Sequence, residues 1–172
     1  MPLGPNPVLR ASNSARILII GQAPGTRVHQ TGIPWNDPSG DRLRDWMQLD
    51  RERFYDERQI AIIPMSFCYP GKGKSGDLPP RPECAPQWHE LLLAELPALQ
   101  LTVLIGQYAQ RYYLASRQRT LAATVQDWRA CLPAFFPLPH PSPRNIRWFR
   151  NNPWFAAEVL PAFRERIRAA LD

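Results

Sequence analysis

The hydrophobic and polar positions along the chain form alternating blocks, and four of the apolar blocks have the length of a strand. They cover residues 16–21, 59–65, 101–106 and 134–138. Short continuous apolar runs of this kind are typical of strands that are buried on both faces of a sheet. The pattern therefore predicts four buried strands.

The segments between these runs show helical spacing, for example at Trp88, Leu91, Leu92 and Leu96. Strands that alternate with helices indicate a parallel sheet covered on both faces. We therefore expect an α/β fold with three α/β/α layers around a central, mainly parallel, four-stranded sheet. The expected helices cover residues 41–49, with Ser39 as the capping candidate, and residues 86–99, 107–114, 120–128 and 153–171. The expected loops, without periodicity, cover residues 22–40 and 67–82.

The length of the chain, 172 residues, suits one hydrophobic core without disulfide or metal support. Residues 1–15 are rich in proline, asparagine and serine, which predicts an irregular N-terminal arm. We expect residues 16–172 to form a single domain. No interdomain linker, internal repeat or low-complexity segment interrupts it.

The formal net charge is +6, and it comes from arginine, because Lys72 and Lys74 are the only lysines. A basic, arginine-rich chain favours a polyanionic partner such as nucleic acid. The sequence has no apolar run of transmembrane length and no signal-peptide pattern at its start, and its three cysteines do not suggest a secreted disulfide framework. We expect a soluble cytoplasmic monomer that does not bind membranes.

Two short motifs follow expected strands. G-Q-A-P-G occupies residues 21–25 and H-P-S-P-R-N occupies residues 140–145. In parallel α/β sheets, ligands bind where loops leave the carboxyl ends of the strands. A glycine-proline turn alone is an ordinary tight turn, but together the two motifs predict a shared site.

These motifs, together with T-G-I-P-W-N-D-P-S-G-D-R-L-R at residues 31–44, resemble the uracil-DNA glycosylase superfamily. The resemblance extends from Ile17 onward and is closest to the thermophile-type, iron-sulfur branch. The second motif is more similar to that of the single-strand-selective monofunctional uracil glycosylases. The resemblance implies an enzyme of base excision repair that hydrolyses the N-glycosidic bond of uracil or another deaminated or damaged base in DNA.

The resemblance also implies roles for individual residues. Trp35 matches the aromatic residue that stacks on the flipped base, although a tryptophan in a core is the alternative. His140 matches the histidine that donates a hydrogen bond to the base O2 as the base leaves. The backbone N–H groups of Gln22 and Ala23 are expected to share that task, in the manner of an oxyanion hole.

Two positions depart from the family pattern. The family's catalytic carboxylate is an aspartate at the position of Ala23 in one branch and a glutamate at the position of Gln22 in the iron-sulfur branch, so this chain has neither. We therefore expect Asp37, or Gln22 as a neutral residue, to place the water. Asp41 is the alternative to Asp37. The asparagine that often contacts the edge of the base is replaced by Pro64. Ser66 is the substitute we expect for base binding, and hypoxanthine, xanthine and oxidised pyrimidines remain possible substrates.

The segment after His140 alternates arginine with aromatic and amide residues, a composition typical of DNA-binding grooves, although a solvated helical face is the alternative. The expected DNA contacts come from Ser142, Pro143, Arg144, Asn145 and Arg147, and from Lys72 and Lys74 in the loop at residues 67–82. Either Arg144 or Ile146 is expected to fill the gap left by the flipped base. Because neither motif holds a lysine for a Schiff base, we expect no lyase step.

Cys68 and Cys84 resemble the last two cluster ligands of the iron-sulfur branch, but no cysteine precedes the first strand. Two thiolates do not hold a cluster that takes four, so we expect neither a metal nor another cofactor. Zinc bound by Cys68, Cys84 and His89 is a weaker alternative. Two other functions stay open. One is a catalytically silent nucleic-acid-binding relative. The other is a small α/β hydrolase or nucleotide-binding enzyme, although this sequence has neither the G-x-S-x-G nor the Walker motif usual in such enzymes.

Overall fold

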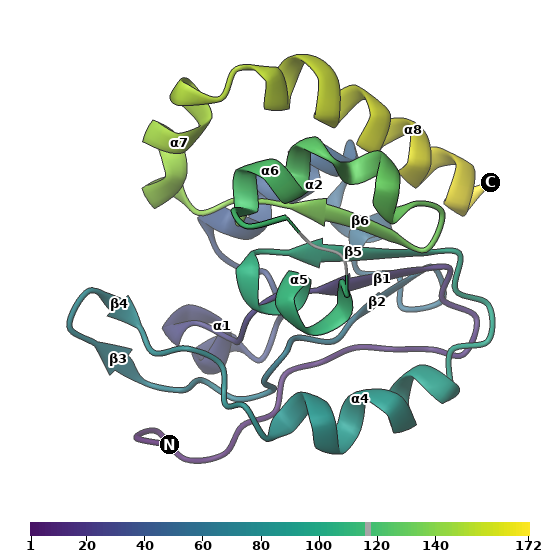
Figure 1. The fold of residues 1–172 in the computed structure, drawn as a ribbon. Helices are drawn as coiled ribbons and strands as arrows, with labels where there is room; N and C mark the ends of the chain where they lie inside the picture. The colour runs from purple at the N-terminus through teal and green to yellow at the C-terminus, as the bar shows by residue number, and fades with distance from the viewer. Residues whose placement is uncertain (116–117) are drawn as a thin grey trace.

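The computed structural model describes residues 1–115 and 118–172 and places a four-stranded sheet at the centre of the molecule (Figure 1). The strands are β1 (Ile17–Ile20), β2 (Ile60–Ile62), β5 (Leu101–Ile105) and β6 (Phe135–Leu138). Their order is β2-β1-β5-β6 and every pairing is parallel. The α/β fold predicted from the apolar runs is confirmed.

Helices cover both faces of this sheet because successive side chains of a strand point to opposite sides. Ile17 and Ile19 of β1 pack in one core with side chains of α2 (Pro38–Met47) and α8 (Leu160–Leu171). Leu18 and Ile20 pack in a second core with α4 (Cys84–Ala94) and α5 (Gln107–Tyr113). In Figure 1 the two helical layers lie above and below the sheet. Among the described residues, no helix combines the length and the apolar character needed to span a bilayer.

Shorter elements complete the chain: α1 (Thr26–Thr31), α3 (Arg51–Phe54), β3 (Lys72–Gly73), β4 (Gly76–Asp77), α6 (Leu121–Gln126), the 3-10 helices η1 (Trp128–Cys131) and η2 (Pro143–Asn145), α7 (Ile146–Asn151) and the π-helical turn η3 (Phe155–Val159). The expectation of plain loops was therefore wrong in two places. Residues 22–40 contain α1, and residues 67–82 contain the antiparallel β3–β4 hairpin. Elements of six and two residues are too short to show a hydrophobic period.

Helix α2 starts earlier than the sequence pattern predicted. Its N-cap is Asp37, whose Oδ1 accepts a hydrogen bond from the Gly40 backbone N–H at 2.8 Å. Pro38 then occupies the first helical position, where its fixed φ is favourable and its missing N–H costs nothing. The expected cap, Ser39, instead lies inside the first turn and is buried.

The N-terminal arm is irregular, and it packs against the sheet. Arg10 and Ile62 exchange backbone hydrogen bonds of 2.9 and 2.7 Å in an antiparallel bridge. The Val8 N–H donates to the Phe67 carbonyl at 2.8 Å, and the Val8 side chain is only 3% exposed. The arm therefore runs beside β2 and contributes to the molecule's interior.

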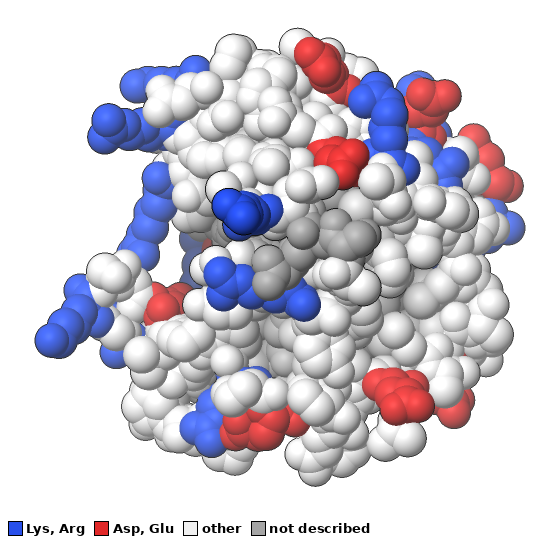
Figure 2. All heavy atoms as spheres, in the orientation of Figure 1, with Lys and Arg blue, Asp and Glu red and all other residues white. Residues whose placement is uncertain are grey.

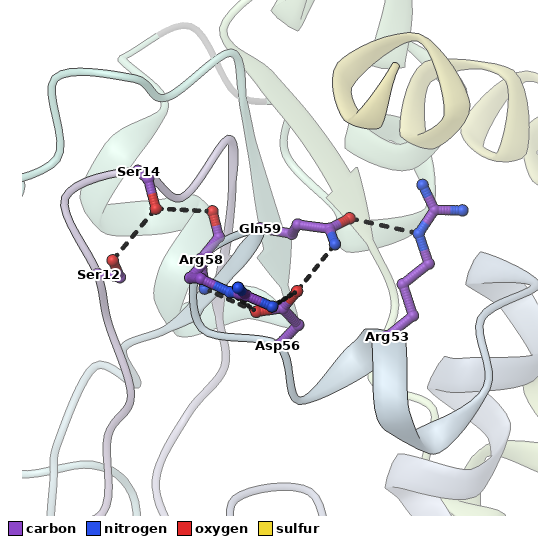
Figure 3. A network of polar contacts seen from close by, with 6 residues as sticks. All are labelled: Ser12, Ser14, Arg53, Asp56, Arg58 and Gln59. Carbon is purple, nitrogen blue, oxygen red and sulfur yellow. Dashed lines mark hydrogen bonds and ion pairs between the residues drawn. The ribbon is translucent and has the colours of Figure 1, made fainter.

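A polar network joins this arm to the turn before β2 (Figure 3). The Asp56 carboxylate accepts hydrogen bonds from Arg58 Nε at 3.0 Å and from Gln59 Nε2 at 2.9 Å. The Ser14 hydroxyl donates to the Arg58 carbonyl at 3.0 Å. The hydrogen bonds from Arg58 and Gln59 lower the pKa of Asp56 below its usual value.

We expect Asp56→Asn to lower the melting temperature at pH 7. A carboxyl group whose pKa is depressed by folding stabilises the folded state above the unfolded pKa, about 3.9 for Asp, and this contribution is lost as the pH falls through the folded pKa. The difference in melting temperature between variant and wild type should therefore become smaller below about pH 4. Thermal unfolding followed by circular dichroism between pH 3 and 7 measures it. Asp45→Asn, at an exposed position on α2, is the control, and equal melting temperatures at pH 7 would contradict the prediction.

Candidate active site

A cavity lies at the carboxyl ends of β1, β2 and β6, where the two sequence motifs meet. Its lining includes the whole segment Gly21 to Gly25 after β1, Trp35 and Asp37 before α2, and His140 after β6. These residues lie far apart in the sequence, and the parallel order of the strands brings their loops to one edge of the sheet. The predicted catalytic residues Gln22, Asp37 and His140 therefore share one cavity.

The aromatic rings of Trp35 and His140 face each other in this cavity. Their centroids are 5.6 Å apart and their planes are tilted by 34°. Trp35 has a φ of 56°, in the left-handed region that bulky side chains rarely adopt. Such a conformation costs about 1–3 kcal/mol and persists only where neighbouring groups hold it.

The neighbouring groups that hold Trp35 are visible. Arg44 Nη1 donates to the Trp35 carbonyl at 3.1 Å, and the Tyr55 hydroxyl donates to the Pro34 carbonyl at 2.7 Å. Gly40 leaves room for the same carbonyl, because a Cβ there would lie 1.7 Å from the Trp35 oxygen. The left-handed backbone of Trp35 is thus fixed from several sides.

Arg44 is buried, with 5% of its surface exposed, and Asp41 balances its charge through a 2.5 Å contact. Asp41, the rival catalytic carboxylate, is therefore engaged in a contact that supports the Trp35 loop. Among the described residues, none of the cavities at this edge of the sheet has Asp41 in its lining.

Hydrogen bonding determines the tautomer of His140. The backbone N–H of Ser142 donates to His140 Nδ1 at 3.2 Å, so Nδ1 carries no proton and the neutral ring carries it on Nε2. Burial lowers the pKa of His140 below its usual value, and the negative charge of Asp37 partly opposes this shift. Near pH 7 His140 is thus a neutral donor. No described residue accepts a hydrogen bond from its Nε2.

Asp37 and Gln22 reach the cavity from two different sides. Asp37 Oδ1 accepts the Gly40 N–H as the cap of α2, which leaves Oδ2 without a described partner. Gln22 packs beside Gly106 after β5 and lines the cavity together with Ala23. Both side chains offer oxygen atoms that accept hydrogen bonds, and only Asp37 brings a negative charge.

The structure places Ser66 outside this cavity. Its side chain is fully buried, its hydroxyl donates to the Cys68 carbonyl at 3.4 Å, and its backbone N–H donates to the Gln22 carbonyl at 3.0 Å. Ser66 therefore fixes the two loops to each other. Near the end of β2, the cavity is lined by Ile62 and by Pro64, the residue that replaces the family's asparagine.

A wider groove adjoins the cavity and shares Gln22, Asp37 and His140 with it. One side is formed by the β3–β4 hairpin and the other by Ser142, Arg144 and Asn145. The side chain of Arg144 reaches the hairpin, since a Cβ on Gly76 would lie 2.5 Å from Arg144 Nη1. Residues that sequence analysis linked to DNA therefore line one side of the groove, and one of them, Arg144, reaches across to the hairpin.

The loop that carries His140 is held by four further hydrogen bonds. Asn145 Nδ2 donates to the His140 carbonyl at 2.8 Å, and the Ser142 hydroxyl accepts the Arg144 N–H at 3.2 Å. Arg42 Nη1 lies 3.4 and 3.3 Å from the carbonyls of Pro141 and Ser142. Part of the predicted DNA-binding set thus also positions the histidine.

The family model of the uracil DNA glycosylase superfamily matches residues 10–164 of this chain. The chain belongs to the uracil DNA glycosylase superfamily. A solution NMR structure from Methanosarcina acetivorans, described as a "putative Uracil DNA glycosylase", matches with a TM-score of 0.54 and 16% identity over 92% of this chain and 97% of that one. At this identity the likeness supports the fold alone, and it agrees with the three-layer architecture.

Basic side chains of this superfamily member gather beside the groove. Figure 2 shows Lys and Arg along the left margin, over the region of α7 and the β3–β4 hairpin. Lys72 and Lys74 are exposed on the hairpin, and Pro143 and Arg147 are exposed on the opposite side. These four residues lie outside the cavity and groove linings, on the surrounding surface.

His89, a candidate zinc ligand in the sequence, is fully engaged in hydrogen bonds. Its Nε2 donates to the Pro64 carbonyl at 2.9 Å, so its Nδ1 accepts from the Tyr113 hydroxyl. Burial lowers the pKa of His89 and keeps it neutral. Cys68 and Cys84 are free and half-buried. Residues 1–115 and 118–172 contain no group of three or more side chains arranged to hold a metal ion.

Sequence reasoning missed most of the apolar lining. Val8, Val28, Pro34 and Ile62 all line the cavity. Val28 lies on α1, which has no clear hydrophobic period, and Val8 belongs to the arm that was expected to be irregular. No local signal identifies Val8, because its position follows from a contact with a strand more than fifty residues later in the sequence.

Proposed function

We propose that the protein is a monofunctional DNA glycosylase that removes uracil or another deaminated or damaged base from DNA. The observation that carries this proposal is the neutral His140, whose Nδ1 accepts the Ser142 N–H and whose Nε2 is left to donate inside a cavity that also holds Trp35. Membership of the superfamily supports DNA as the substrate.

The reaction begins with a base that is rotated out of the DNA stack into the cavity. Trp35 stacks on that base, an interaction worth about 1–3 kcal/mol. The fixed left-handed backbone of Trp35 keeps its ring in place before the base arrives, so little ordering cost remains at binding.

His140 then stabilises the departing base. As the bond between C1′ and the base nitrogen breaks, its electron pair moves onto the base, and His140 Nε2–H donates a hydrogen bond to the oxygen that gains charge. A preorganised donor of this kind is worth about 2.7–4 kcal/mol. Water then forms the new bond to C1′ and loses a proton. The base anion takes up a proton in turn, which leaves an abasic sugar and the neutral free base.

Asp37 and Gln22 are the two groups proposed to place that water. A carboxylate near a sugar cation stabilises it, and Asp37 retains Oδ2 for this purpose while Oδ1 caps α2. Gln22 offers a neutral amide in the same cavity. Lys72 and Lys74, the only lysines, lie outside the cavity lining, so no amine stands ready to form a Schiff base.

The groove and its basic surroundings are proposed to bind the DNA backbone. Ser142, Arg144 and Asn145 lie on one side of the groove, while Lys72 and Lys74 extend from the hairpin on the other. We further propose that the protein acts as a monomer in the cytoplasm. Three free cysteines are consistent with a reducing compartment.

The deciding experiment is a base-release assay. Labelled single-stranded and duplex oligonucleotides containing uracil, hypoxanthine or xanthine are incubated with the protein, and abasic sites are then cleaved with alkali. Cleavage of one of these substrates supports the proposal and names the base. DNA binding without any cleavage would instead favour a silent binding relative, because the usual carboxylate is replaced by Ala23.

The pH dependence of base release gives a separate prediction. Because burial lowers the pKa of His140, kcat/KM should stay constant from pH 8 down to about 6.5, the ordinary pKa of histidine, and fall only below it. Protonation would place a hydrogen on Nδ1, where Ser142 donates. Single-turnover rates between pH 5 and 8, with folding checked by circular dichroism, measure the profile. A midpoint above 6.5 would contradict a neutral His140.

A further inference from the structure

The N-terminal arm supplies one wall of the cavity. The antiparallel bridge between Arg10 and Ile62 and the hydrogen bond from the Val8 N–H to the Phe67 carbonyl hold the arm beside the end of β2. The Val8 side chain is 3% exposed and lines the cavity together with Ile62 and Pro64. Val8 lies outside residues 10–164, the part of the chain matched by the superfamily model.

This wall has few polar groups left for a ligand. Pro64 has no backbone N–H, and its carbonyl accepts from His89 Nε2 at 2.9 Å. The backbone N–H groups of Met65 and Ser66 donate to the carbonyls of Gly21 and Gln22 at 2.9 and 3.0 Å. A base that contacts this wall therefore contacts mainly methyl and methylene groups. Their contribution to the binding free energy depends on how closely the base fits against them.

We propose that Val8 is a specificity-determining residue, and that the wall formed by Val8, Ile62 and Pro64 selects the flipped base by size and shape. The inference rests on the proposed function, because it takes the cavity as the pocket for the flipped base. One methylene more or less in an apolar pocket changes discrimination by about 10- to 200-fold. A single side chain at position 8 is thus sufficient to shift the preference between a small and a large base.

Two substitutions that change the size of Val8 in opposite directions test this inference. Val8→Ala deepens the pocket and should raise the ratio of kcat/KM for hypoxanthine over uracil by about 10-fold. Val8→Ile narrows the pocket and should lower the same ratio. Opposite shifts are expected only from a residue that contacts the base, since a general loss of packing would lower both rates together.

Leu9→Ala provides the matched control. Leu9 is the next residue of the arm and lines neither the cavity nor the groove, so its replacement disturbs the packing of the arm without changing the pocket. The ratio of kcat/KM for hypoxanthine over uracil in Leu9→Ala should equal that of the wild type. Thermal unfolding of all variants identifies any that fail to fold, and Val8→Ile, which loses no atoms, keeps the test valid if Val8→Ala is unstable.

Binding measurements separate this inference from the proposed function. The affinities for oligonucleotides that contain uracil or hypoxanthine, measured by fluorescence anisotropy, should show the same opposite shifts even if the protein releases no base. Base release by the wild type with an unchanged ratio in both variants would overturn the role of Val8 alone. If the wild type showed neither base release nor base-dependent binding, both proposals would be overturned.

Discussion

Replacing His140 with alanine should lower kcat for base release by about 10²- to 10³-fold, the loss found when one donor to a developing oxyanion is removed. The imidazole Nε2–H is the donor that disappears. The loop should keep its shape, because Asn145 Nδ2 binds the backbone carbonyl of residue 140, which alanine retains. Single-turnover assays with saturating enzyme measure the chemical step directly.

The affinity of this variant for DNA should change little, because the basic side chains beside the groove are untouched. His29→Ala is a suitable control, since His29 lies on α1 and lines neither the cavity nor the groove. If His140→Ala released base at the wild-type rate while His29→Ala did the same, a hydrogen bond from His140 to the leaving base would be excluded.

Gly40→Ala should disrupt base binding through Trp35. A Cβ at position 40 would lie 1.7 Å from the Trp35 carbonyl oxygen, so either the first turn of α2 or the Trp35 loop must move. Loss of stacking on the base would cost about 1–3 kcal/mol, which corresponds to roughly 5- to 150-fold in affinity. The preference for uracil-containing over undamaged oligonucleotides, measured by fluorescence anisotropy, should fall by this factor.

The melting temperature of Gly40→Ala should fall as well, because the contacts of Arg44 and Tyr55 with the displaced loop are lost. Asp45→Ala, at an exposed position of the same helix, controls for the effect of alanine in α2. A Gly40→Ala protein with normal base preference would show that the observed conformation of Trp35 is not required for binding.

Much of the fold was predictable because each buried parallel strand corresponds to a short continuous run of apolar residues in the sequence. The parallel order of the strands places both motifs at one edge of the sheet, so the sharing of a cavity by Gln22 and His140 followed from the strand prediction, whereas Trp35 was expected there from the family resemblance. The residues that support them were not predictable in this way. Arg44 looks like an ordinary helix residue, and only the folded chain shows that it is buried against the Trp35 carbonyl.

Asp37 illustrates a different limit. The sequence identified it as a candidate, but its role as the cap of α2 depends on where that helix begins, which periodicity locates poorly. Ser66 illustrates a further limit. Its place after β2 suggested base contact, whereas burial and its hydrogen bonds with Cys68 and Gln22 direct it into the interior.

The bridge between Arg10 and Ile62 has a consequence for the behaviour of the protein in solution. β2 is an outer strand of the sheet, and such strands can recruit a strand of another molecule and start aggregation. The arm occupies the backbone groups of Ile62 on that side and thus shields the strand. A truncation that removes Arg10 would therefore threaten solubility, whereas a fusion partner attached at the exposed Met1 leaves this shield in place.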